Sequence, residues 1–210
     1  RSAGVVVAGA TRTIDRRGID ARGENCSIER TIMKFDLTYK IRVGDEVIDS
    51  DQALSHIDTY RDRLTPVGGV DGALVLRVDG DEYCGDQYDP IVRLATHWVR
   101  KVPWVLGGDT ETVAFRNSEH CFAFVPAGES VEVSFFVGTE TEIEEYVCEP
   151  LIVRLDAFAP QSLALADHVL KLARALDPRV VDSEEDVRDL AVSLEEGRAA
   201  WRDYQLHNRR

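Results

Sequence analysis

Cysteine and histidine side chains are the first candidates for chemistry in this chain, because their sulfur and nitrogen atoms bind zinc. Five of them are spread along the sequence: Cys84, His97, His120, Cys121 and Cys148. Structural zinc sites usually combine close pairs, since one turn then fixes two ligands at once, and the sequence contains no C-x-x-C motif. The adjacent His120 and Cys121 would point to opposite faces of a strand. We therefore expect no metal and no cofactor, and we expect reduced, mostly buried thiols.

Carboxylates also gather between residues 79 and 89, where the sequence places Asp79, Asp81, Glu82, Asp86 and Asp89. A calcium loop of the EF-hand kind needs an oxygen ligand at its fifth position and glycine at its sixth. Tyr83 and Cys84 occupy those two positions. The pattern therefore favours a solvated hairpin tip over a divalent-metal site.

Hydrolase and nucleotide-binding motifs are absent from the sequence. It has no G-x-S-x-G nucleophile elbow. The glycines at 107 and 108 match neither of the phosphate-binding motifs G-x-x-x-x-G-K-[ST] and G-x-G-x-x-G. An enzyme would have to assemble its site from scattered residues, which only geometry reveals. Under this alternative, with zinc as an option, the first residues to test are Asp109, Glu111, His120 and Cys121.

An excess of acidic residues is the most informative global property of the chain. Its 210 residues carry 38 Asp and Glu against 25 Lys and Arg, which gives a formal net charge of -13. Such a surface attracts cations and basic proteins and repels phosphate backbones. We therefore expect a non-enzymatic interaction protein that binds a basic protein partner, as an inhibitor, an immunity-type antidote or an adaptor would. We expect no nucleic-acid binding.

One acidic run is a candidate partner-binding surface. It consists of Glu140, Glu142, Glu144 and Glu145, and it precedes a strand expected near Leu151. The acids at 184–186 complement the dipole of a predicted helix, whereas this run has no such local explanation. A solvated loop is the alternative interpretation of the run.

The end of the chain offers a second candidate partner-binding surface, formed by Trp201 and Tyr204. Both lie in an amphipathic, Arg-rich segment of the predicted last helix. Aromatic and Arg side chains are enriched in the energetically important centres of interfaces. Packing within the domain and a homodimer through the C-terminal helix are the alternatives.

The composition of the chain changes near its only methionine, Met33. Residues 1–32 carry six Arg and four acids, with several glycines and little apolar periodicity. We expect a disordered or poorly ordered leader here, with a basic arm that folds onto the body as the alternative. Residues 33–210 are expected to form a single acidic α+β domain.

Alternating apolar residues predict antiparallel hairpins in this domain. Every second residue from Phe35 to Val43 is apolar, and a turn at residues 44–45 leads to a returning strand. A second hairpin is predicted around Asp79 and Gly80. Further strands are predicted at residues 113–115, 122–124, 131–137 and 151–155.

Helical periodicity predicts the remaining elements. The first helix is expected to begin with Ser50 or Asp51 as its N-cap, and a central helix with Asp89 as N-cap and Pro90 as first residue. Two helices close the chain, the last with a capping box at Ser183 and Asp186. Because strands come as hairpins and helices in blocks, we expect an α+β fold: a mostly antiparallel sheet with the central helix and the two C-terminal helices packed against it.

The hydropathy pattern bears on location. No run reaches the roughly eighteen apolar residues of a membrane span, and the Val-rich stretch at residues 5–8 is too short for the core of a signal peptide. We therefore expect a soluble cytoplasmic protein with no membrane partner.

Overall fold

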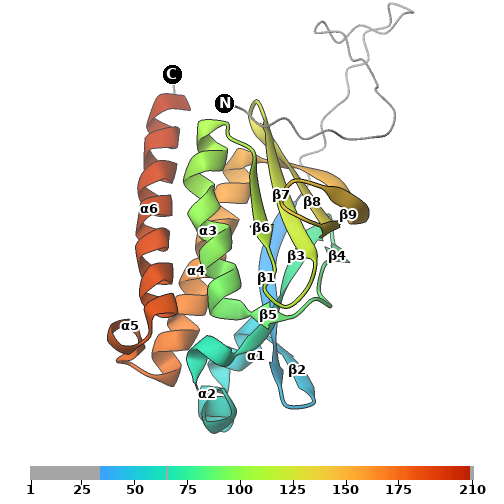
Figure 1. Ribbon diagram of the computed structural model, residues 1–210. Helices are drawn as coiled ribbons and strands as arrows, with labels where there is room; N and C mark the ends of the chain where they lie inside the picture. The colour runs from blue at the N-terminus through green and yellow to red at the C-terminus, as the bar shows by residue number, and fades with distance from the viewer. Residues whose placement is uncertain (1–33, 65, 209–210) are drawn as a thin grey trace, which may run out of the picture.

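The computed structural model of the chain describes residues 34–64 and 66–208 (Figure 1). The predicted leader, residues 1–32, lies outside the described residues. The fold class is confirmed: two antiparallel sheets pack with helices in an α+β arrangement. The predicted hairpins are divided between these two sheets, where the sequence suggested a single one.

The first sheet, sheet A, is built around the predicted alternating strand. In the described part of the chain it has five strands: β1 (Phe35–Val43), β2 (Glu46–Asp49), β3 (Asp71–Val78), β4 (Asp81–Tyr83) and β5 (Asp89–Pro90). β1 pairs antiparallel with β2 and β3, while β4 and β5 both pair with β3. Every second residue of β1, from Phe35 to Val43, is buried, as the alternation predicts.

The second sheet, sheet B, is an antiparallel meander. Within residues 111–154 it consists of four strands: β6 (Glu111–Ala114), β7 (His120–Ala127), β8 (Ser130–Gly138) and β9 (Ile143–Arg154). Phe122, Phe124 and Phe135 point from this sheet into the core. The strand that we expected near Leu151 already begins at Ile143, because β9 pairs with the full length of β8 through register shifts that absorb its extra residues.

The first predicted helix is correct in place but is broken into short pieces. These are α1 (Ser50–Ser55), α2 (Ile57–Tyr60), and the 3-10 turns η1 (Arg61–Arg63) and η2 (Val67–Gly69). The N-cap prediction was wrong by one residue or two: the Asp49 carboxylate accepts the Gln52 amide N–H at 2.7 Å. This is the usual way an aspartate satisfies a free N–H in a first helical turn.

A layer of long helices covers the sheets (Figure 1). Its members are α3 (Ile91–Gly107), α4 (Leu155–Leu176) and α6 (Glu185–Asn208), with the short α5 (Val180–Ser183) before α6. α4 packs against β1, β8 and β9, while α3 packs against β3, β6 and β7. α6 lies outermost and packs against α3 and α4. The sheets therefore meet the helical layer mainly through α3 and α4.

Trp98 lies where α3, α4 and sheet B meet, and none of its surface is exposed. Its indole N–H donates to the Ser162 hydroxyl on α4 at 2.9 Å. Its ring contacts Phe122 and Phe124 of β7 edge-on, with centroids 4.9 and 4.6 Å away. Phe158 of α4 lies between this cluster and Phe35 of sheet A. One aromatic cluster thus joins both sheets to the helical layer.

The predicted helix cap at Asp89 was wrong. α3 begins at Ile91, and Asp89 belongs to β5, where it is 1% exposed. Its carboxylate accepts the backbone N–H groups of Arg116 and Asn117 at 3.0 and 3.2 Å. The pairing of β5 with β3 keeps Asp89 in extended backbone, so its side chain fixes the loop after β6 instead of the start of α3.

The predicted capping box at Ser183 and Asp186 was also wrong. The Ser183 hydroxyl donates to the carbonyl oxygens of Arg179 and Val180 at 3.2 and 3.4 Å, because Ser183 is the last residue of α5. Between α5 and α6, Glu184 accepts the Gly68 amide N–H at 3.0 Å. The link between these helices is therefore held by a contact with η2.

Replacing Asp89 with Ala should lower the free energy of unfolding by about 2–4 kcal/mol, because two backbone N–H groups lose a charged acceptor. Asp89→Asn keeps one carbonyl oxygen and should cost less. Denaturant unfolding of both variants measures the effect, with Asp109→Asn at an exposed position as the control, expected to stay within about 0.5 kcal/mol of the wild type. A loss for Asp89→Ala no larger than that of the control would contradict this role.

Candidate functional site

The end of α6 borders a cavity of about 470 Å³. Its walls come from the β7–β8 turn, the β9–α4 junction and the last turns of α6, and they include Glu129, Arg154, Asp156, Pro160, Trp201 and Tyr204. The Leu155 amide N–H donates to the Glu129 carbonyl at 2.9 Å, which pins the turn to the first residue of α4. The cavity is therefore built from three separate segments of the chain.

Two aromatic residues of α6 form one wall of this cavity. Trp201 and Tyr204 are three residues apart, which places them on the same side of a helix. Their rings stack with centroids 5.5 Å apart and planes within 17° of parallel. Both side chains are half-buried and pack against the main core. The two side chains therefore pack within the domain, as one of the alternatives predicted, and they also border a cavity.

Charged side chains form another part of the cavity lining. Arg154 donates to both oxygens of Asp156, from Nε to Oδ1 at 3.0 Å and from Nη2 to Oδ2 at 2.7 Å. These hydrogen bonds lower the pKa of Asp156 despite its partial desolvation. Glu129 lies 3.8 Å from Arg154 and its side chain is 82% exposed. Burial, helped by the Glu129 and Asp156 charges, raises the pKa of the Tyr204 phenol. The wall is acidic overall, with Glu129 only weakly held.

A second cavity of about 510 Å³ lies on the other side of the same helix end. Pro103 and Leu106 of α3 and Ala200 and His207 of α6 line it, and Tyr204 lines both cavities. Tyr204 and Asn208 thus border both cavities at the end of the helical layer.

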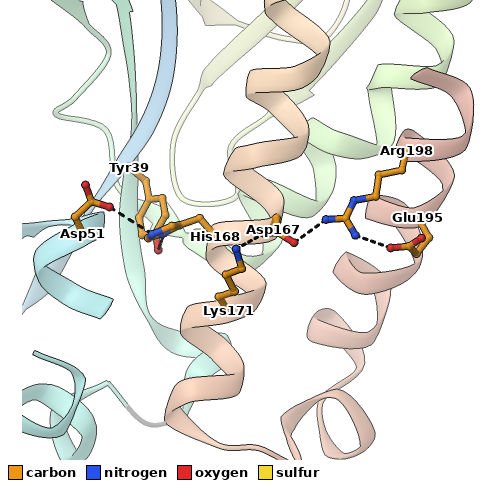
Figure 2. A network of polar contacts seen from close by, with 7 residues as sticks. All are labelled: Tyr39, Asp51, Asp167, His168, Lys171, Glu195 and Arg198. Carbon is orange, nitrogen blue, oxygen red and sulfur yellow. Dashed lines mark hydrogen bonds and ion pairs between the residues drawn. The ribbon is translucent and has the colours of Figure 1, made fainter. Parts of the chain in front are cut away.

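Polar contacts between α4 and α6 hold this helix end in place (Figure 2). Asp167 of α4 accepts from Arg198 of α6 and from Lys171, each at 2.7 Å. Arg198 also pairs with Glu195 at 2.7 Å. Nearby, Gly197 allows close approach, because a Cβ there would lie 2.9 Å from the Leu163 side chain. The network fixes α6 one turn before Trp201.

A second polar chain in Figure 2 joins β1, α4 and α1. The buried Tyr39 hydroxyl lies 3.0 Å from His168 Nδ1, and His168 Nε2 lies 3.5 Å from Asp51. Burial, with a smaller effect of the Asp51 charge, raises the pKa of Tyr39 far above its usual range. The phenol therefore stays protonated within hydrogen-bond distance of the imidazole. Such a group is unsuited to act as a base or nucleophile, so we interpret this chain of contacts as structural.

The predicted acidic run lies far from the cavity. Glu140, Glu142, Glu144 and Glu145 are all exposed, at and after the connection between β8 and β9. Glu129 precedes the other end of β8, whose nine residues span about 30 Å in extended conformation. The two predicted partner-binding surfaces therefore sit at opposite ends of sheet B.

The residues of the enzymatic alternative are not brought together. Glu111 pairs with Lys101 at 2.7 Å at the start of β6, whereas Cys121 pairs with the last residue of that strand. His120 stacks on the Phe135 ring of the main core, and Cys121 lies in a small cluster on the other face, as their adjacency in a strand predicts. Asp109 follows the end of α3.

The described residues, 34–64 and 66–208, contain no candidate metal site. In that part of the chain no three His, Cys, Asp or Glu side chains gather so that they could hold a metal ion. Likewise, none of the described helices is long and apolar enough to cross a bilayer. The geometry thus supplies no metal centre from the residues that it describes.

The surface of α3 differs from the rest of the molecule in charge. This helix contains Arg93, Arg100, Lys101 and no acidic residue. Burial and these three cations lower the pKa of His97. Arg93 Nη1 is buried without a hydrogen-bond partner among the described residues. Arg100 and Lys101 pair with Asp189 of α6 and Glu111 of β6 at 3.1 and 2.7 Å, so neighbouring carboxylates match two of the three positive charges.

Comparison with known proteins gives no identity. No family model matches this chain. Neither the curated proteins nor the solved structures contain a significant match.

Sequence reasoning found the aromatic wall of the cavity and missed its charged wall. Trp201 and Tyr204 share a helix face, which spacing alone reveals. Glu129, Arg154 and Asp156 come from a turn and a strand–helix junction, and only tertiary packing brings them to α6. The sequence signal was limited to Arg154 and Asp156 flanking the first residue of α4.

Replacing Asp167 with Asn should destabilise the protein by about 1 kcal/mol at pH 7. Burial alone would raise the pKa of Asp167, but hydrogen bonds from Lys171 and Arg198 lower it. A lowered folded-state pKa stabilises the fold above the unfolded pKa, and this contribution is lost as the pH falls through the folded-state value. The difference between wild type and variant should therefore vanish in acid. Unfolding curves from pH 7 down to about 2 measure it.

The matched control for this prediction is Asp62→Asn, at an exposed position. It should follow the wild-type stability at every pH. A gap between wild type and Asp167→Asn that stays constant down to the lowest pH would show that the carboxylate charge does not anchor α6.

Proposed function

We propose that this chain is a non-enzymatic binding protein for a basic protein partner, and that the cavity at the end of α6 receives a Lys or Arg side chain of that partner. One observation carries the proposal: the stacked Trp201 and Tyr204 rings line the same cavity as the carboxylates of Glu129 and Asp156. Aromatic rings attract cations through their quadrupole, and a nearby carboxylate adds a charged acceptor.

Arg154 sets how the guest cation would bind. It already satisfies both oxygens of Asp156, whereas its distance of 3.8 Å from Glu129 is too long for a hydrogen bond. Glu129 is therefore the carboxylate available to the incoming group. Its turn is held at the start of α4 by the hydrogen bond from the Leu155 N–H to the Glu129 carbonyl, and its side chain lines the same cavity as Trp201 and Tyr204.

The acidic run adds a second contact about 30 Å away, the length of β8. A partner that reaches both surfaces has to be a protein of domain size. The net charge of -13 would speed its approach and make the association rate fall with salt. Inhibitor, immunity-type and adaptor roles all fit a protein that occludes a basic surface, and a cytoplasmic location and the absence of nucleic-acid binding belong to the same proposal.

The enzymatic alternative has no comparable support, because no observation favours convergence of its four residues. A homodimer through the C-terminal helix remains an alternative occupant of the aromatic wall. The enzymatic and homodimer alternatives both differ from the main proposal in one measurable respect. Only the main proposal predicts that an added cation changes the Trp201 indole signal.

The test is a titration of the full chain with acetyl-arginine amide, acetyl-lysine amide and acetyl-glutamate amide, followed by the indole N–H signals in NMR spectra. The two cations should shift the Trp201 signal in a saturable way, and the glutamate amide should not. Glu129→Gln should weaken the binding of the arginine amide by about two- to fivefold, the range of an exposed ion pair. Added salt should weaken it further.

Two controls are available within the chain. Trp104 is 56% exposed on α3 and is not among the residues that line this cavity, so its indole signal should not respond to the cations. Glu142→Gln, in the acidic run, should bind the amide like the wild type. Equal shifts at Trp104 and Trp201, or none at Trp201, would refute the cavity role. A Trp201 signal that depends only on protein concentration would favour the homodimer.

A further inference from the structure

Cys84 and Cys148 lie in contact across the two sheets, although 64 positions separate them in the sequence. Cys84 follows β4 of sheet A, and Cys148 lies within β9 of sheet B. The two thiol groups lie close enough to interact, and neither is in a disulfide. Both side chains also pack with the main core. The pair is therefore a direct bridge between segments of different sheets.

The backbone is irregular at both cysteines. Cys84 has a φ of +68°, a left-handed conformation that non-glycine residues rarely adopt. Cys148 pairs with Phe135 between two register shifts, where β9 departs from a regular ladder. Bulges re-aim side chains, and strained residues persist only where the surrounding structure holds them. Both cysteines therefore stand at positions where the backbone departs from regular strand geometry.

The loop that carries Cys84 is held in position by charges on sheet A. Glu82 of β4 pairs with Lys40 at 2.5 Å and with Arg77 at 3.1 Å. A Cβ on the adjacent Gly85 would lie 2.9 Å from the Glu82 carboxylate, so the chain passes close to this ion pair. Cys84 is accordingly presented by an ordered segment, with its side chain half-buried.

We propose that Cys84 and Cys148 are a site of reversible disulfide formation that staples sheet A to sheet B in the folded protein. The co-reactant is a small disulfide such as oxidised glutathione. A metal is a poor alternative occupant, because a structural zinc ion needs four ligands, and no third such group lies near the pair among the described residues.

The exchange proceeds in two balanced steps. The thiolate of Cys84, the more accessible cysteine, attacks one sulfur of oxidised glutathione and displaces one glutathione thiolate. The thiolate of Cys148 then attacks the Cys84 sulfur of this mixed disulfide and displaces the second glutathione. The protein loses two thiol protons, the two released glutathione thiolates take them up, and one molecule of oxidised glutathione is reduced to two thiols.

The environment predicts slow exchange at neutral pH. The hydrogen bond between the thiols, followed by burial, raises the pKa of Cys84 well above its usual range. Only the thiolate attacks a disulfide, so the rate should rise about tenfold per pH unit in this range. The reaction therefore responds to prolonged oxidising conditions and not to brief exposure.

The test uses the full chain with Cys26→Ser and Cys121→Ser, which leaves only the proposed pair. Incubation of this folded protein with oxidised glutathione should lower its mass by about 2 Da, the two hydrogens lost. Peptide mapping should recover the peptides that contain Cys84 and Cys148 as one cross-linked species. The melting temperature should rise by roughly 10 °C, because the bond closes a long loop, and dithiothreitol should reverse both changes.

Cys84→Ser in the same background is the matched control and should show neither the mass loss nor the rise in melting temperature. Stable glutathione adducts without a cross-link, or a cross-link that forms only in denaturant, would overturn the proposal. So would a cross-link that leaves the melting temperature unchanged. Wild-type protein mapped in parallel guards against an effect of the two background substitutions, since the same cross-linked peptides should appear there.

Discussion

The burial of Trp98 is the constraint on which the remaining structure depends. Its indole is completely enclosed, and its only polar atom is satisfied by Ser162, whose hydroxyl in turn donates to the Phe158 carbonyl at 2.8 Å. Truncation of such a residue costs about 3–5 kcal/mol, a large fraction of the stability of a typical domain. Because Phe158 also touches Phe35, the same cluster sets the positions of sheet A, α4, α3 and sheet B. The helical layer and the two sheets are therefore held together by one aromatic centre.

The candidate site lies outside this aromatic cluster. α6 lies outside the aromatic cluster and is oriented by ion pairs and by the close approach at Gly197. Its last turns, the β7–β8 turn and the junction of β9 and α4 together line the cavity, to which they contribute both aromatic and acidic side chains. At the far end of sheet B the acidic run continues the negative surface, while α3 is locally basic.

Local patterns in the sequence predicted local structure well. The alternation in β1, the hairpin turn at Asp79 and Gly80, and the amphipathic spacing of the long helices each follow from periods of 2 and 3.6 residues. Predictions failed where a side chain hydrogen-bonds to a group other than the start of the helix that follows it in the sequence. Asp89 is a sound N-cap by type, yet it serves a loop 27 residues away, and Ser183 belongs to the preceding helix. The same limit applies to the sites: Trp201 and Tyr204 share a face, but Glu129, and the contact of Cys84 with Cys148, arise only from tertiary packing.

Native-state hydrogen exchange on the wild type and on Trp98→Phe tests the central claim most directly. In the wild type, the slowest amides should lie in α3, α4 and β7, and all should exchange with the free energy of global unfolding. Trp98→Phe removes the indole N–H and part of the packing, so protection should fall by the same amount in all three elements. A loss confined to α3, with β7 and α4 still fully protected, would show that Trp98 does not join them.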